Sequence, residues 1–233
     1  MADFVLVHGA WHGAWCWRRV IALLRATGHG VHAVTLSGVG ERAHIPAASV
    51  SLDTHVHDIL GVIAAEELEA PILVGHSYAG MPMTGAADRL TTGLQRLVYL
   101  DAVVPLPGEA WSSGHTEPVR AARRAAIARS GSIPPPDPAL FGLEGADHAW
   151  VARRQTPQPG AVYDAALEFD PARWAAHPRS FIDCTRPALE TIAAARLRVR
   201  QQPGWDLHEI ATGHDAMVSA PQALVRILLS LAH

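Results

Sequence analysis

Short apolar runs alternate along this chain with longer stretches in which apolar residues recur every three or four positions. The short runs predict buried strands, and the longer stretches predict helices with one buried face. The expected strands are residues 4–7, 31–36, 72–74, 97–101, 181–184 and 207–210. The expected helices are residues 15–26, 52–66, 81–90, 189–195 and 221–231. This alternation indicates the α/β class, with a mostly parallel sheet flanked by helices.

The alternation stops between residues 105 and 178. This stretch carries many prolines, scattered tryptophans and one helical run, residues 119–129. A segment of this length inside a compact domain is usually functional or insertional. We therefore expect residues 1–104 and 179–233 to form the core. Residues 105–178, called the inserted segment below, are expected to form a mostly helical lid after the strand that ends at Asp101.

Residues 71–80, P-I-L-V-G-H-S-Y-A-G, are the most informative stretch of the chain. An apolar run meets a tight turn, and a helix-compatible run follows. In this strand–turn–helix context a serine hydroxyl is held above the end of a sheet, so we expect Ser77 to be a nucleophile. Ala79 stands where the usual pattern has glycine, and Gly80 directly after it keeps the crowding low.

A serine hydroxyl is a weak nucleophile at neutral pH and needs a base to accept its proton. In this arrangement the base is a histidine on the loop after the last strand. Of the fourteen histidines in the chain, His214 alone lies there, between the expected strand 207–210 and the expected terminal helix. We expect His214 to be the catalytic base.

A carboxylate that orients the imidazole would complete a catalytic triad. The usual topology places it after the strand 181–184, but the following loop has no acid: Asp183 falls inside the strand and Glu190 in a helix. Asp101 ends the strand that neighbours the nucleophile strand, and strand ends at this edge face the site. We favour Asp101 as the acid, with Asp183 and Glu190 as alternatives.

An oxyanion hole needs two backbone N–H groups aimed at the developing negative charge. We expect one from Tyr78, directly after the nucleophile, and one from Ala10, in the loop after the first strand, where Gly9 lets the backbone approach the substrate. Aromatic side chains at a seam between lid and core favour an apolar or aromatic substrate. The candidate substrate-binding residues are Trp11, His76, Trp111 and Trp150.

With these residues placed, the chain resembles the α/β-hydrolase superfamily, and within it the group of plant methylesterases, hydroxynitrile lyases and small bacterial esterases. The resemblance covers residues 4–15, 75–80, 98–105 and 213–218. It implies that the lyase branch carries threonine at the position of Gly9 and lysine at the position of Asp215. Because both lyase features are missing here, an esterase-like activity is favoured.

The leading hypothesis is hydrolysis of an ester, lactone, carbamate or activated amide through an acyl-enzyme. One alternative is a small-molecule receptor that keeps the triad but turns over slowly or not at all. Another is a cofactor-free lyase or perhydrolase on the same triad. The histidine pairs His8/His12 and His55/His57 lack a further ligand at metal spacing, so we expect neither a metal nor any other cofactor.

The composition of the chain excludes several other kinds of catalytic site and binding partner. All nineteen basic residues are arginine, which excludes a Schiff-base lysine and a P-loop lysine. A net charge of −3 supplies no field for nucleic acid or an anionic membrane. Cys16 and Cys184 give no disulfide framework, and the first residues have neither a basic region nor a long apolar stretch. We expect a cytoplasmic enzyme acting on a small molecule, and a homodimer is compatible with the sequence.

Overall fold

The computed structural model describes residues 1–232, and the predicted α/β architecture is confirmed. Six parallel strands form one sheet in the order β2–β1–β3–β4–β7–β8. Their bounds are β1 Asp3–Val7, β2 Gly30–Val34, β3 Ile72–His76, β4 Arg96–Leu100, β7 Arg179–Cys184 and β8 Trp205–Ile210. The carboxyl ends of β1, β3 and β4 therefore meet at one edge, where loops from distant parts of the sequence converge.

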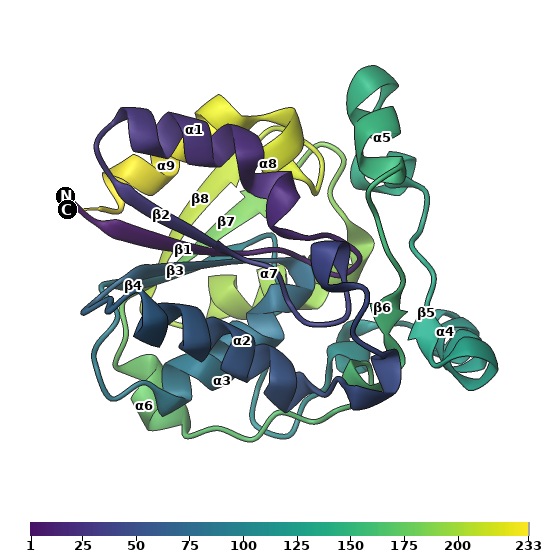
Figure 1. Cartoon of the computed structure of the whole chain (residues 1–233). Coiled ribbons are helices and arrows are strands. Elements are labelled where there is room, and N and C mark those ends of the chain that lie inside the picture. The colour runs from purple at the N-terminus through teal and green to yellow at the C-terminus, as the bar shows by residue number, and fades with distance from the viewer. Residues whose placement is uncertain (233) are drawn as a thin grey trace.

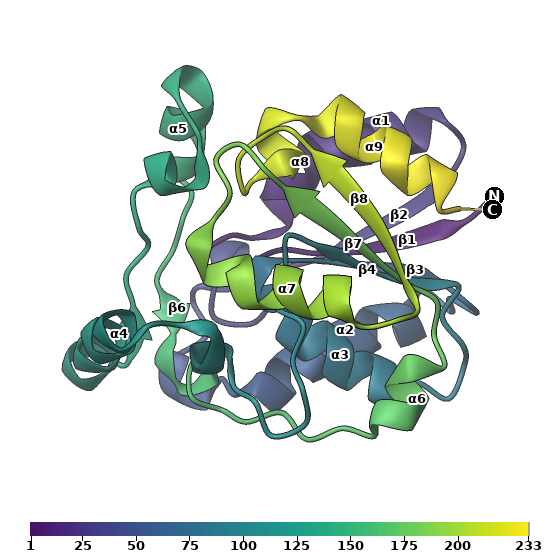
Figure 2. The same ribbon diagram turned by 180° about the vertical axis from the view of Figure 1, so that it is seen from behind.

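Helices cover both faces of the sheet (Figures 1 and 2). One face carries α1 Arg18–Ala26, α8 Ala216–Ser219 and α9 Pro221–Ser230, and the other carries α2 Leu52–Ala65, α3 Gly80–Arg89 and α7 Ala193–Gln201. Because both faces are covered, the central strands are continuous apolar runs, and the side chains of Phe4, Leu6, Ile72 and Leu73 are fully buried. Within residues 1–232 the structure has no helix that is both long and apolar enough to cross a bilayer.

The stretch around α7 differs from the sequence-based prediction. The expected helix 189–195 is a short 3-10 turn, Glu190–Ile192, followed by α7, which continues to Gln201. Ile192, Ala195 and Val199 are buried at helical spacing, so the apolar stripe extends further than the arginine-rich sequence suggested. Arg196 and Arg200 of α7 form ion pairs with Asp101 and Asp183 at the carboxyl edge of the sheet, and the pair of Arg196 with Asp101 lies next to the candidate site.

The inserted segment contains more structure than its sequence pattern indicated. Beyond the expected helical run, here α4 Glu117–Ser130, it has α5 Gly145–Ala152, α6 Pro171–Ala175, and a small antiparallel pair, β5 Ser132–Ile133 with β6 Gln158–Pro159. α4 and α5 lie beyond the carboxyl ends of the strands (Figure 1). In contrast, α6 packs against α3, and the indole of Trp174 donates to the Tyr99 hydroxyl at 2.8 Å. Part of this segment is therefore fixed to the core.

Candidate active site

Ser77 stands at a strained turn between β3 and α3. Its φ angle is 56°, in the left-handed region that non-glycine residues rarely adopt. The 3-10 turn Ser77–Ala79 leads directly into α3, and Val103 N–H donates to the Ser77 carbonyl at 3.0 Å. A Cβ on Gly80 would overlap the carbonyl oxygen of Val103, so this position requires glycine. The crowding that usually demands glycine one residue earlier falls on Gly80 in this chain.

His214 and Asp101 come together although 113 residues separate them. His214 lies on the loop between β8 and α8, and its Nδ1 is 2.6 Å from Oδ2 of Asp101. Asp101 directly follows β4 with a φ angle of 41°, and both side chains are buried. Ser77 and His214 line the same cavity of about 240 Å³. The serine, the imidazole and this carboxylate thus occupy one site at the sheet edge.

The two alternative acids have other surroundings. Asp183, in β7, binds Arg196 Nε at 2.5 Å and Arg200 Nη2 at 2.6 Å. Glu190 is exposed in the turn that precedes α7. Arg196 also donates to Oδ1 of Asp101 at 2.7 Å, so one guanidinium bridges Asp101 and Asp183. Asp101 therefore binds His214 through one oxygen and Arg196 through the other.

The loop after β1 is held in place by the inserted segment. Trp11 has a φ angle of 66°; its backbone N–H donates to Gln158 Oε1 at 3.1 Å, and its carbonyl accepts from Thr156 N–H at 3.0 Å. Within residues 1–232 the N–H of Ala10 has no hydrogen-bond partner, although Ala10 is buried. The N–H of Tyr78 belongs to the first turn of its helix, where backbone donors have no partner in the same helix.

Gly9 and Asp215 are the two positions that differ from the lyase pattern. Gly9 is sterically crowded, and Asp215 is held in a buried hydrogen bond. A Cβ on Gly9 would lie 2.8 Å from Ser77 Cβ and 2.8 Å from His76 Nδ1, so a threonine would force a shift. Asp215 is fully buried and accepts from His12 Nε2 at 3.2 Å. Neither position presents a hydroxyl or an amine to the cavity.

Comparison with known proteins identifies the family. The sequence profile of the alpha/beta hydrolase family matches residues 4–227. The chain is 39% identical to the carbendazim hydrolyzing esterase of Nocardioides sp. (strain SG-4G), over 99% of this chain and 100% of that protein.

The chain belongs to the α/β-hydrolase family.

Further similarities agree with this assignment. A solved methylesterase from Arabidopsis superposes with a TM-score of 0.80 at 25% identity, over 99% of this chain and 98% of that one. An extracellular α/β-hydrolase from a Paenibacillus species superposes with a TM-score of 0.87 at 19% identity, over the whole of both chains. A probable esterase from Oryza sativa subsp. indica is 37% identical over 46% of this chain and 41% of its own length. The chain is therefore an enzyme, an esterase-like α/β-hydrolase.

A buried polar network lies behind the catalytic edge of this α/β-hydrolase. Burial would raise the pKa of Asp215, but the charge and hydrogen bond of His12 outweigh this and lower it to about 2. Burial lowers the pKa of His12, but Asp215 outweighs this and raises it above 6.5. Burial keeps the pKa of His76 well below 6.5, so His76 is neutral and its Nε2 donates to the His214 carbonyl at 3.1 Å.

This network also contains the one group of side chains in the described structure with metal-like spacing. Nitrogen and oxygen atoms of His76, His214 and Asp215 lie within 4.8 Å of one another, and all three residues are buried. These residues already take part in hydrogen bonds: His214 donates to Asp101, His76 donates to the His214 carbonyl, and Asp215 accepts from His12. These hydrogen bonds support the His214 loop.

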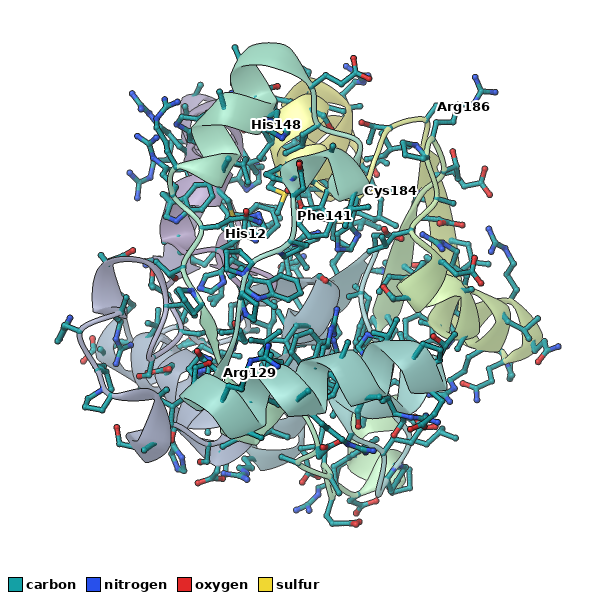
Figure 3. All side chains as sticks on the ribbon, turned by 90° about the vertical axis from the view of Figure 1, so that its right-hand side faces the viewer. His12, Arg129, Phe141, His148, Cys184 and Arg186 are labelled. Carbon is teal, nitrogen blue, oxygen red and sulfur yellow. The ribbon has the colours of Figure 1, made fainter. Side chains whose placement is uncertain are left out.

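Two of the four candidate substrate-binding residues reach the cavity. Trp11 and Trp111 line it, with their rings 5.8 Å apart, whereas His76 and Trp150 do not. Trp150 lies on α5, where its ring meets the Trp15 ring at 5.2 Å. Figure 3 looks onto this edge, with His12 and Phe141 near the centre and α4 crossing the front. His76 binds the backbone of the His214 loop and does not face the cavity.

Several residues of the cavity wall could not be predicted from the sequence. The inserted segment contributes His115, Arg123 and Phe141 to it. Arg123 sits among other arginines on α4, and the sequence pattern gives no means of telling which of them faces inward. Arg196 was missed for the same reason, because its partners are set by the packing of α7 against the sheet edge.

Proposed function

We propose that this α/β-hydrolase cleaves ester-type bonds through an acyl-enzyme on Ser77, with His214 as the base, Asp101 as the acid that orients it, and the N–H groups of Ala10 and Tyr78 as the oxyanion hole. The observation that carries the proposal is the 2.6 Å hydrogen bond from His214 Nδ1 to Asp101 Oδ2, next to a cavity that Ser77 and His214 share. Nδ1 is the donor in this bond, which leaves Nε2 of the neutral imidazole free to accept a proton.

In the first half of the reaction Ser77 Oγ attacks the ester carbonyl while its proton passes to His214 Nε2. The carbonyl oxygen takes up negative charge, for which the free N–H of Ala10 and that of Tyr78 are suited as donors. His214 then returns the proton to the leaving alkoxide, the bond from the carbonyl carbon to that oxygen breaks, and an alcohol departs.

In the second half water attacks the acyl group on Ser77. His214 takes one proton from the water, the tetrahedral intermediate collapses, and the proton is returned to Ser77 Oγ, releasing a carboxylic acid. Asp101 stays ionised throughout and stabilises the imidazolium that forms in each half. Arg196 is a positioning residue, because it fixes the second oxygen of Asp101.

The cavity supports a small aromatic substrate. Its wall is mostly apolar and aromatic, and Trp11, Trp111 and Phe141 all contribute rings. The Nocardioides relative is named for hydrolysis of carbendazim. We propose that this chain acts on esters or carbamates of small aromatic groups. The crowding at Gly9 and the burial of Asp215 disfavour lyase chemistry at this site.

A lid role for the inserted segment belongs to the same proposal. Its α4 and its aromatic side chains close the cavity on the side away from the sheet, and Gln158 and Thr156 bind the loop that carries Ala10. We propose that substrate enters between this segment and the core. The two hydrogen bonds to the Ala10 loop would then couple the position of the lid to the oxyanion hole.

Steady-state turnover of aryl acetates and aryl methyl carbamates tests the proposal. We expect many turnovers per enzyme, and a loss on the order of 10⁶-fold in kcat for Ser77→Ala or His214→Ala. Ser112→Ala, a buried serine of the inserted segment, is the matched control and should keep kcat within about threefold. Ser77→Ala with more than a hundredth of the wild-type kcat would contradict acyl-enzyme chemistry, and release of a single equivalent of product would favour a receptor.

A further inference from the structure

Arg123 is a guanidinium in the wall of a cavity that has no carboxylate. It lines the same cavity as Ser77 and His214, and within the described residues no aspartate or glutamate lines that cavity. The charges of the neighbouring arginines on α4 are neutralised by surface ion pairs. Arg120 pairs with Glu117 at 2.8 Å, and Arg124 pairs with Asp164 at 2.9 Å. Arg123 forms no ion pair within residues 1–232.

The surroundings of Arg123 stabilise its charge without neutralising it. The guanidinium lies over three aromatic rings, 4.8 Å from Trp111 and 5.4 Å from both Trp11 and Tyr163, which gives cation–π attraction. Its Nη1 lies 3.2 Å from Nε2 of His115. Burial first, and then the charges of Arg123 and Arg120, lower the pKa of His115 to about 3, so this imidazole is neutral.

A half-buried cation of this kind favours an anionic ligand. Burial lowers the pKa of Arg123, a sign that its charged form has lost hydration that the rings and His115 only partly replace. A guanidinium nevertheless stays protonated in proteins and presents a planar fork of donors that matches a carboxylate. The remainder of the cavity wall is apolar apart from Ser77, Thr191 and the histidines, so a carboxylate there would find Arg123 as its one permanently charged partner within the described structure.

We propose that Arg123 makes this enzyme selective for esters that carry an additional carboxylate group. The guanidinium holds this carboxylate while Ser77 attacks the ester carbonyl. This inference rests on the proposed hydrolysis. The carboxylate could belong to either the alcohol part or the acyl part of the ester, and two matched substrate pairs distinguish these. The alcohol pair is 4-acetoxybenzoate and phenyl acetate. The acyl pair is 4-nitrophenyl hemiglutarate and 4-nitrophenyl valerate.

The kinetic arm compares kcat/KM within each pair. We expect the wild-type enzyme to prefer the carboxylate member of at least one pair by about 10-fold or more, as one charge-assisted bond would give. Arg123→Met keeps the apolar stem over the rings and should lose about 10- to 100-fold on that member alone. Arg123→Lys should recover part of the loss. Arg129→Met, which removes an exposed charge from the same helix (Figure 3), should change neither member.

A binding arm, independent of turnover, compares phenylacetate with phenylacetamide by calorimetry. Tighter binding of phenylacetate that Arg123→Met abolishes supports the anion site even if no ester is hydrolysed, and in that case only the proposed hydrolysis fails. Turnover that depends on Ser77 but shows no carboxylate preference in either arm overturns the inference and leaves the hydrolysis intact. An equal loss on both members of each pair in Arg123→Met also overturns it.

Discussion

At the scale of single residues, the acid that we propose for the triad is where this chain departs most from the usual arrangement. The expected loop after β7 holds no acid, and Asp183 at the end of that strand is taken up by Arg196 and Arg200. Asp101 lies one strand nearer the nucleophile and binds His214. The same Arg196 binds both carboxylates, so an acid at either strand end would be close to this guanidinium.

The acid assignment predicts different results for three conservative variants. Asp101→Asn should lower kcat by roughly 10³- to 10⁴-fold with little change in KM, because the imidazole loses both its orientation and its charge partner. Asp183→Asn should lower kcat less than 10-fold but cost roughly 1–3 kcal/mol of folding free energy, since a charged group loses its buried partner. Glu190→Gln, at an exposed residue, should change neither quantity.

Kinetics with an aryl ester and urea unfolding of the same preparations separate these effects. A loss in kcat for Asp183→Asn as large as that for Asp101→Asn would contradict the assignment. Equal and small losses for all three variants would do the same, because they would mean that His214 works without any of these carboxylates.

At the scale of elements, the strand–turn–helix unit at Ser77 could be predicted from the sequence, because its signal is local. An apolar run, small residues and a helical run follow one another within twenty positions. The acid that binds His214 could be narrowed to three candidates from the sequence, because parallel strands end at one edge of the sheet. The inward arginines, Arg123 and Arg196, could not be singled out, since each lies in a run of similar arginines and only packing decides which one is buried.

The turn at Ser77 predicts a large cost for adding one methyl group. Gly80→Ala should destabilise the fold by about 3 kcal/mol and lower kcat. The new Cβ would overlap the Val103 carbonyl, so the backbone of the turn at Ser77 would have to move. Gly61→Ala in α2 is the matched control. Nothing lies within 4 Å of a Cβ there, so the same change should stabilise the fold by roughly 0.5–1 kcal/mol.

Urea denaturation and aryl ester kinetics measure both effects. If Gly80→Ala kept wild-type stability and activity, the turn at Ser77 would be less tightly packed against Val103 than the structure indicates. The comparison with Gly61→Ala removes the general effect of a Gly→Ala change in a helix.

At the scale of the whole molecule, the buried pair His12–Asp215 should give folding stability a distinctive pH dependence. Asp215 has a folded pKa of about 2 against 3.8 ordinarily, so its contribution is present above about pH 4 and is lost as the pH falls toward 2. His12 has a raised pKa, so its contribution is present below 6.5 and is lost as the pH rises through that raised value.

Asp215→Asn should therefore cost most between about pH 4 and 6.5, by roughly 3–5 kcal/mol, because it leaves His12 buried without a charged partner. Urea unfolding of both proteins across this range measures the difference. Asp164→Asn, at a half-exposed surface pair, is the control and should cost less than about 1 kcal/mol throughout. A cost for Asp215→Asn that does not vary with pH would mean that the pair is not charged.

The contacts of the inserted segment with the Ala10 loop give a second prediction at this scale. Gln158→Leu removes the side-chain acceptor of the buried Trp11 N–H, which should cost roughly 1–3 kcal/mol of folding free energy. Because the same loop carries Ala10, kcat should fall by about 10-fold or more while KM changes little. Unchanged kcat in a folded variant would contradict a link between the inserted segment and the oxyanion hole.

Activation of Ser77 by His214 is the central step of the proposed reaction, and covalent labelling tests it directly. A fluorophosphonate probe should add one equivalent to the wild-type protein, peptide mapping should place it on Ser77, and its second-order rate should fall by about 10³-fold or more in His214→Ala. Labelling at another residue, or a rate unchanged by the loss of His214, would contradict the account.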